Sequence, residues 1–209
     1  MLAGQTLKAS DGYDVMLFPL EYMNISQDEY GQYSHQDILA MDFLGWGANG
    51  RILLCPYYAP CNCRCIGTTS SENRIFQSTD KVHLADGTLD YVSWVCAHDN
   101  TPISVGTTLF QGTIMGHTGT AGNVTGDHLH LNIAKGVYQN WERVPPSNNW
   151  QLKNSMHIYN ACYVNDTVII NGENHDWKTY TGPTPIIINK HRFPWPIYAR
   201  IIRDKKTYI

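Results

Sequence analysis

Residues 112–133 read GTIMGHTGTAGNVTGDHLHLNI. Glycine recurs among threonines through most of this stretch, so the backbone there must turn tightly. The segment lacks the Gly-Lys-Ser/Thr ending of a phosphate-binding loop, and the residues that follow have the pattern of a strand rather than a helix. We therefore predict a turn system at 112–126 that leads into a strand at 128–134.

The predicted strand carries two histidines. Successive side chains of a β-strand alternate between its faces, so His128 and His130 would project from one face about 7 Å apart. One metal ion and a reacting water molecule could contact both rings. A His-x-His pair is weak support by itself, because most such pairs are accidents of a surface or a core. The other groups of a metal site must come from elsewhere in the chain.

Strand patterns dominate the rest of the sequence. Short apolar or alternating runs lie between Gly, Asn, Asp and Pro residues at 51–57, 74–84, 88–97, 157–163, 167–170 and 183–189. The Asp86-Gly87 pair predicts a hairpin, because both residues tolerate positive φ, and this hairpin would place His98 just past the end of a strand. We predict a mainly β fold, with an antiparallel β-sheet core, a groove-shaped active site, long loops and little helix.

The composition changes after residue 137, where Trp, Tyr, Pro and Asn become frequent. We predict a core at 1–137 and, at 138–209, an elaboration of the same domain that is rich in strands, loops and aromatic residues. A separate binding module is the less favoured interpretation. The aromatic residues could stack on a glycan or line a peptide groove, but packing in the core and loops is the more common role.

Bulk properties exclude several classes of partner. A length of 209 residues suits one main domain, and a net charge of −3 provides no general basic surface, so no nucleic acid partner is expected. The longest apolar runs, such as 185–188, are far shorter than the roughly 20 residues of a membrane span. The N-terminus lacks the basic and apolar regions of a secretory signal peptide.

The chain contains six cysteines, an even number that would allow disulfides as well as free thiols. The chain is large enough to need no stapling and shows no export signal, so reduced thiols are favoured. Cys61, Cys63 and Cys65 alternate and would point to one face of a strand, whereas zinc sites favour cysteine pairs separated by two to four residues. Buried strand thiols are the preferred interpretation, and a second metal or a disulfide stays open.

A second candidate for metal binding lies near the N-terminus. His35 and Asp42 stand among apolar residues that suggest burial, and a buried carboxylate needs a partner or a metal. Two imidazoles and one carboxylate form a usual ligand set of catalytic zinc, with water in the fourth position. Zinc lowers the pKa of that water toward about 7, so a hydroxide-like nucleophile exists at neutral pH.

These motifs resemble the lysostaphin-like (LytM-like) zinc endopeptidases that cut peptidoglycan peptides. The resemblance runs from about residue 18 to residue 133. The last motif of the family, a glycine-spaced turn ending in G-x-H-L-H and followed by an apolar residue, is similar to 112–133. The middle motif, a histidine after an apolar strand and a small residue, is matched by His98. The first motif is a histidine and then an aspartate, followed by a strand that ends in Ala-Pro, as Asp42 is followed by Ala59-Pro60.

The resemblance implies the roles of five residues. His35, Asp42 and His130 would bind one zinc ion per chain, and the catalytic residues His98 and His128 would flank the metal-bound water. A neutral imidazole can accept the proton of that water, and its protonated form can stabilise the oxyanion or protonate the leaving amine.

One spacing departs from the family. The histidine of the first motif usually precedes the aspartate by four residues, whereas His35 precedes Asp42 by seven, so an insertion is implied. Asp37 is the alternative ligand, but it lacks the strand ending in Ala-Pro that follows Asp42. Asp42 is therefore preferred.

The resemblance implies a zinc-dependent endopeptidase that hydrolyses amide bonds in the peptide stems or cross-bridges of bacterial peptidoglycan and lyses cells. A chain without a signal peptide fits a bacteriophage lysin that leaves the host cytoplasm through a holin pore. It equally fits an enzyme of the virion tail with tail proteins as partners, or a piece of a larger virion protein. The alternative is a non-enzymatic relative that acts as a structural tail protein or binds the cell wall.

The remaining histidines have no partner at ligand spacing in the sequence. His117 could line the substrate groove, but a solvated loop histidine is the favoured interpretation. The others are His83, His157, His175 and His191.

Overall fold

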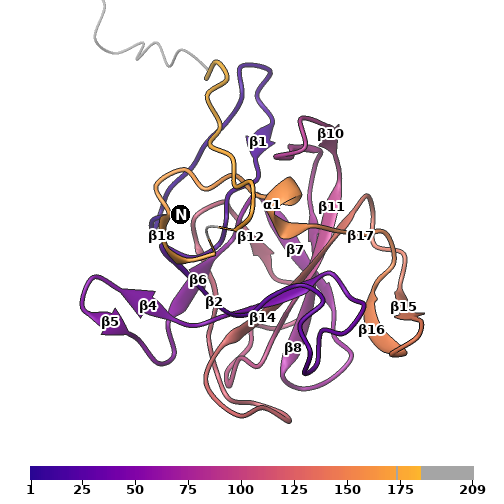
Figure 1. Ribbon diagram of the computed structural model, residues 1–209. Helices are drawn as coiled ribbons and strands as arrows, with labels where there is room; N and C mark the ends of the chain where they lie inside the picture. The colour runs from indigo at the N-terminus through magenta and orange to yellow at the C-terminus, as the bar shows by residue number, and fades with distance from the viewer. Residues whose placement is uncertain (173, 185–209) are drawn as a thin grey trace, which may run out of the picture.

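One large β-sheet forms the centre of the protein (Figure 1). The structure is a computed structural model that describes residues 1–172 and 174–184. The strands of this sheet run in the order β12-β7-β8-β11-β14-β3-β2-β18, and β17 pairs with β14 beside this path. The neighbouring strands pair antiparallel, apart from the parallel pair of β18 and β2. The predicted mainly β fold with an antiparallel core is therefore confirmed. The bounds are β12 Thr108–Leu109, β7 Cys63–Gly67, β8 Asn73–Ser78, β11 Val92–Ala97, β14 Leu129–Lys135, β3 Ala40–Phe43, β2 Tyr22–Gln27, β18 Val168–Asn171 and β17 Ser155–Met156.

Smaller sheets surround the large one. In Figure 1 the β4–β5 and β15–β16 hairpins project on opposite sides of the molecule. The remaining pairs are β1 with β9, β9 with β10, and β6 with β13. The bounds are β1 Asp14–Val15, β4 Trp46–Gly47, β5 Gly50–Arg51, β6 Pro56–Tyr58, β9 Val82–His83, β10 Leu89–Asp90, β13 Ile114–His117, β15 Trp141–Val144 and β16 Asn149–Leu152. The predicted turn system thus contains one strand, β13.

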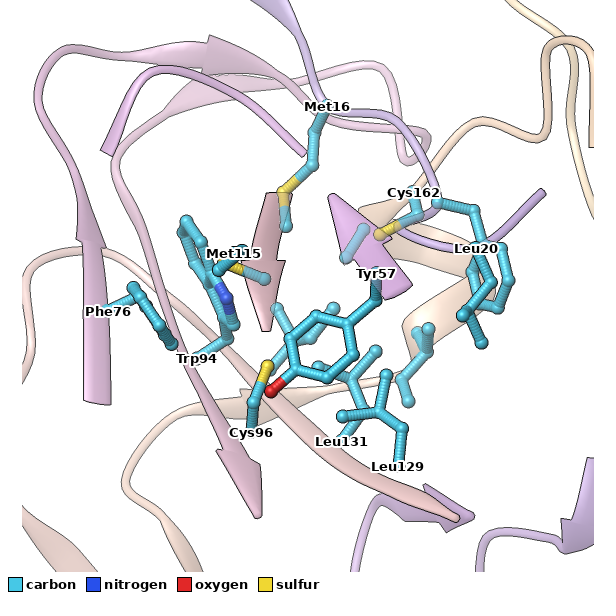
Figure 2. Packing of buried hydrophobic residues seen from close by; sticks show 14 of the residues in the cluster. Met16, Leu20, Tyr57, Phe76, Trp94, Cys96, Met115, Leu129, Leu131 and Cys162 are labelled. Carbon is cyan, nitrogen blue, oxygen red and sulfur yellow. The ribbon is translucent and has the colours of Figure 1, made fainter. Parts of the chain in front are cut away.

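The middle of the large sheet is the strand β14, predicted at 128–134. It lies between β3 and β11, and its register sets His130 opposite Asp42 on one side and opposite Ala97 on the other. Alternation along β14 turns Leu129, Leu131 and Ile133 into the core. Figure 2 shows Leu129 and Leu131 below Tyr57, with Trp94 beside Phe76. The rings of Trp94 and Phe76 stack with centroids 5.5 Å apart.

The predicted hairpin at Asp86-Gly87 is confirmed. β9 and β10 pair antiparallel around it, and Gly87 has a φ of 85°. β11 then ends at Ala97, so His98 follows the strand directly, as expected. Of the other predicted strands, 167–170 corresponds to β18. The runs 51–57, 74–84 and 88–97 are each broken into two strands, and the run 183–189 extends outside the described residues.

The predicted strand at 157–163 is wrong, because this segment contains the short helix α1, Ile158–Ala161. Its turn buries Ile158 and Ala161, which are three positions apart, in the main core. The carboxylate of Glu29 accepts a hydrogen bond from the first helical N–H, at 3.2 Å between Glu29 Oε1 and Ile158 N. A distant acid therefore caps the turn, and no local pattern could reveal it.

Several of the described residues after 137 belong to the main core and sheet. β17 pairs with β14, β18 pairs with β2, and Ile158, Ala161 and Cys162 belong to the main apolar cluster. That residues 138–209 elaborate the same domain as residues 1–137 stays a prediction, and these contacts support it. The described residues contain no helix with the length and apolar character needed to cross a membrane.

The six cysteines are all buried and unpaired. On β7 Cys63 and Cys65 face the core while Arg64 and Ile66 face outward, and burial raises the pKa of each of the two thiols. Within the described residues, the one cluster with ligand atoms close enough to share a metal contains no cysteine. The thiols are therefore buried, and Cys63, Cys65 and Cys96 lie on strands, while Cys61 precedes β7.

Burial and raised pKa values predict slow thiol chemistry. We expect the native protein to react with DTNB at far less than one thiol per chain in the first minutes, and all six thiols to react in guanidinium without reductant. Absorbance of the released thiolate measures both. Fewer than six reactive thiols in the denatured chain would reveal a disulfide and contradict this arrangement.

Candidate metal centre

Three side chains converge where β3 and β14 pair. His35 Nε2 lies 3.3 Å from Asp42 Oδ1 and 3.2 Å from His130 Nδ1, and His130 Nδ1 lies 3.0 Å from Asp42 Oδ1. Within the described residues this is the one group of three whose ligand atoms approach closely enough to hold a metal ion.

The triangle has the dimensions of a zinc site. Zinc–ligand distances of about 2.0–2.2 Å and tetrahedral angles put neighbouring ligand atoms about 3.3 Å apart. The separations of 3.0, 3.2 and 3.3 Å match this value. Two imidazole nitrogens and one carboxylate oxygen are also a usual ligand set of catalytic zinc. The residues therefore fit the ion that the motifs imply.

His35 comes from the loop between β2 and β3. Its side chain is fully buried, and Nδ1 donates a hydrogen bond to the carbonyl oxygen of Asp28 at 3.1 Å. Nε2 faces Asp42 and His130, and in the neutral ring with the proton on Nδ1 it carries the lone pair that a metal ligand needs. Asp37 points elsewhere, because its carboxylate accepts a hydrogen bond from Ser147 N at 2.9 Å. His35 precedes Asp42 by seven residues, and the loop between them brings the two side chains together while it leaves Asp37 outside the cluster.

The charge states suit metal binding. Burial acts to raise the pKa of Asp42, but the hydrogen bonds and charges of His130 and His35 outweigh it and hold the pKa below its usual range. Burial is the main cause that lowers the pKa of His130, against the opposing effect of Asp42. A carboxylate and a neutral imidazole are the forms that bind a metal ion.

Two further histidines face the cluster. The ring centroids of His98 and His128 lie 4.7 Å apart, and His128 Nε2 lies 3.6 Å from Asp42 Oδ1. His98 Nδ1 donates to the carbonyl oxygen of Ala121 at 2.9 Å, and His128 Nδ1 donates to that of Gly126 at 2.8 Å. Burial is the main cause that lowers the pKa of His98. Both rings can therefore accept a proton at Nε2.

The backbone of His98 is held in an uncommon conformation. Its φ is 75°, in the left-handed region that a residue other than glycine rarely adopts. The turn at Gly119 packs directly on it, because a methyl group at Gly119 would overlap the carbonyl oxygen of His98. The same oxygen accepts a hydrogen bond from Ala121 N at 3.1 Å. Such strain persists where surrounding contacts enforce it, and it is common at functional sites.

The cluster lies in a groove of about 740 Å³. His98, His128, His130 and Asp42 line it together with side chains from distant parts of the chain. These include Tyr33, Arg51, Glu72 and Trp141. The predicted groove is therefore present, and its lining includes residues of loops and of the hairpin strands β5 and β15.

Asp127, which is buried just before His128, is a further residue of the site that the motifs did not indicate. Its Oδ1 accepts from the Thr118 hydroxyl at 2.6 Å, and its Oδ2 accepts from Leu54 N at 3.0 Å. The guanidinium of Arg51 donates to its carbonyl oxygen. A charged residue between glycine and the His-x-His pair was a signal, but its partners come from far along the chain.

The remaining histidines lie away from the triangle. His117 is half-buried on β13 and does not line the groove. Three others have carboxylate partners that the sequence did not indicate, namely His83 with Asp11, His157 with Glu29 and His175 with Asp28. His191 lies outside the described residues.

No model of a protein family matches this chain. Over 177 residues the chain is 42% identical to Morphogenesis protein 1 of Bacillus phage B103, a match that covers 83% of this chain and 47% of that protein. The chain thus spans about half the length of this curated relative.

Similar solved structures include peptidases of the lysostaphin type, the family that the motifs resemble. The catalytic domain of the antimicrobial peptidase lysostaphin from Staphylococcus simulans has a TM-score of 0.43 and 14% identity, over 65% of this chain and 88% of that one. A zinc-containing peptidase from Vibrio cholerae has a TM-score of 0.42 and 15% identity, over 62% of this chain and 43% of that one.

Two glycines of the turn system provide a matched test of its packing. Gly119→Ala should lower the free energy of unfolding by about 1–3 kcal/mol, because its methyl group meets backbone that cannot move freely. A methyl group at Gly126 meets nothing within 4 Å, so Gly126→Ala should change stability by less than about 0.5 kcal/mol. Urea denaturation measures both, and equal effects would contradict the close packing on His98.

Proposed function

We propose that this protein is a zinc-dependent endopeptidase that hydrolyses amide bonds in the peptide stems or cross-bridges of bacterial peptidoglycan. The observation that carries the proposal is the triangle of His35, Asp42 and His130 within a groove that two more histidines face. The sequence motifs that these five residues occupy support the substrate class.

In this proposal His35 Nε2, Asp42 Oδ1 and His130 Nδ1 hold the zinc ion. When bound, zinc supplies a Lewis acid for the scissile carbonyl and lowers the pKa of the attacking water. The chain would contribute a fixed and largely buried set of ligands. His35 is fully buried, and both His35 and Asp42 are hydrogen-bonded before any ion binds. Such preorganisation avoids the cost of arranging ligands during binding.

His98 and His128 move the proton in this proposal. Each has Nδ1 committed to a backbone carbonyl, so Nε2 is the free basic atom. One ring accepts a proton from the attacking water, and a protonated ring then donates to the amine that leaves. The low pKa of His98 favours the neutral ring that proton acceptance requires.

We further propose a phage origin and a role at the cell wall. The identity of 42% to a morphogenesis protein of Bacillus phage B103 supports the origin and favours an enzyme associated with the virion over a free lysin. Tail proteins are then its expected partners. A structural or wall-binding protein without activity is the alternative, and the experiment below separates the two.

Digestion of purified peptidoglycan tests the activity. We expect new amine termini by mass spectrometry, at positions that identify the bond, and we expect a chelator to abolish them and added zinc to restore them. Full activity of the metal-stripped protein would exclude zinc dependence. Peptidoglycan binding without any cleavage would favour the wall-binding alternative.

Two variants separate metal binding from proton transfer. His130→Ala should lose both zinc and activity, because it removes one of three ligands. His128→Ala should keep most of its zinc, and its turnover should fall by about 10²–10⁴-fold, which is the usual contribution of a general acid or base. Zinc content by atomic absorption and the rate of amine release measure both, with His117→Ala as the control. Full activity of His128→Ala would overturn its role.

A further inference from the structure

Two adjacent acids, Asp28 and Glu29, follow β2 in the loop that carries His35. Both bind histidines that lie more than a hundred residues away. His175 Nε2 lies 2.9 and 2.8 Å from the two carboxylate oxygens of Asp28. His157 Nδ1 lies 2.6 Å from Glu29 Oε2, and this carboxylate is almost fully buried, with 3% of its side chain exposed. His157 and His175 thus hold the loop at two neighbouring points.

The two histidines form one stack. Tyr159 lies between them, with its ring centroid 4.8 Å from that of His157 and 4.8 Å from that of His175. The interplanar angles are 22° and 16°, so the three rings are nearly parallel. Trp177 packs edge-on against Tyr159 and against Phe18 of the main core. The stack therefore fixes the spacing of both carboxylate-binding rings and ties them to the core.

The loop that these rings hold sets the orientation of His35. The carbonyl oxygen of Asp28 accepts the Nδ1 hydrogen bond of His35 at 3.1 Å. It also accepts a hydrogen bond from Gly31 N at 3.1 Å, which closes the turn. A carbonyl oxygen can only accept, so its position determines which nitrogen of His35 carries the proton and where Nε2 points. Any shift of Asp28 would move this acceptor.

We propose that the stack of His157, Tyr159 and His175, by binding Asp28 and Glu29, is a positioning device that aims Nε2 of His35 at the zinc site. We call these five residues the acid clamp. The proposal rests on the proposed function, because it assigns His35 as a zinc ligand. It gives the aromatic-rich segment after residue 137 a role in the metal site itself.

The clamp is not a second metal site. Each acid binds its own histidine, and within the described residues no group of three metal-binding side chains other than His35, Asp42 and His130 comes close enough to share an ion. Groups that orient a metal-binding histidine from behind commonly contribute about 10–100-fold to metal affinity. This range sets the size of the expected effect.

The test compares zinc affinity in matched variants. The double variant His157→Ala/His175→Ala removes both contacts to the acids. The control His83→Ala removes a similar pair, because His83 Nε2 lies 2.8 Å from Asp11 Oδ2, away from the groove. Competition with a fluorescent zinc chelator measures the dissociation constant, and circular dichroism checks that each variant is folded. We expect the double variant to bind zinc about 10–100-fold more weakly and the control to bind like the wild type.

A second readout uses the metal-free protein. Nitrogen-15 NMR of labelled histidine should show His35 as the single Nδ1–H tautomer in the wild type and as a mixture in the double variant. A purely structural role would lower stability and leave both the tautomer and the zinc affinity of the folded fraction unchanged. Wild-type zinc affinity and an unchanged tautomer in the double variant would overturn the proposal.

The design distinguishes the clamp from the function on which it rests. If the wild type binds no zinc, the proposed function fails, and the tautomer of His35 alone decides whether the clamp orients it. If the double variant does not fold, Asp28→Asn takes its place, because 44% of that side chain is exposed and the change is small. We expect Asp28→Asn to weaken zinc binding several-fold, and wild-type affinity in this variant would count against the clamp.

Discussion

The pairing of β3 with β14 is the constraint on which the rest of the site depends. It sets Asp42 opposite His130, while the next pair, Met41 and Leu131, lies on the other face and is buried in the core. Because side chains alternate along a strand, a slip of β3 by one residue against β14 would turn Asp42 into the core and Met41 toward the groove. Burial of apolar side chains on one face of the sheet therefore fixes Asp42 and His130 on the other face. Both residues of this pair come from strands and not from a loop.

Hydrogen bonds to backbone carbonyl groups orient the three histidine rings that are not on β14. His35, His98 and His128 each donate Nδ1–H to a carbonyl oxygen of a loop. Nε2 of His35 then faces Asp42 and His130, and the rings of His98 and His128 line the groove. The tautomer of every one of these rings is thus decided by the path of a loop rather than by another side chain. The turn system packs closely beside two of these rings, where Gly119 lies against His98 and the buried carboxylate of Asp127, next to His128, binds Thr118 and Leu54.

The six thiols and the metal centre occupy separate parts of the molecule. Cys61, Cys63 and Cys65 fill the apolar core, where burial raises their pKa values and favours the neutral thiol. The candidate ligands are imidazoles and a carboxylate, which suit an ion that must also bind water and substrate. The segment after residue 137 contributes to both parts, through Cys162 in the core and through the rings that hold Asp28 and Glu29.

The sequence by itself determined the β class, the hairpin at Asp86-Gly87 and the five residues that the structure brings together around one groove. These features follow from alternation, turn chemistry and short motifs, all of which are local. Tertiary structure decided the rest, including the turn of α1 that Glu29 caps, the loop that brings His35 to Asp42, and the carboxylate partners of His157 and His175. Each depends on contacts between residues far apart in the chain, and hydrogen bonds over such separations leave no periodic pattern to read.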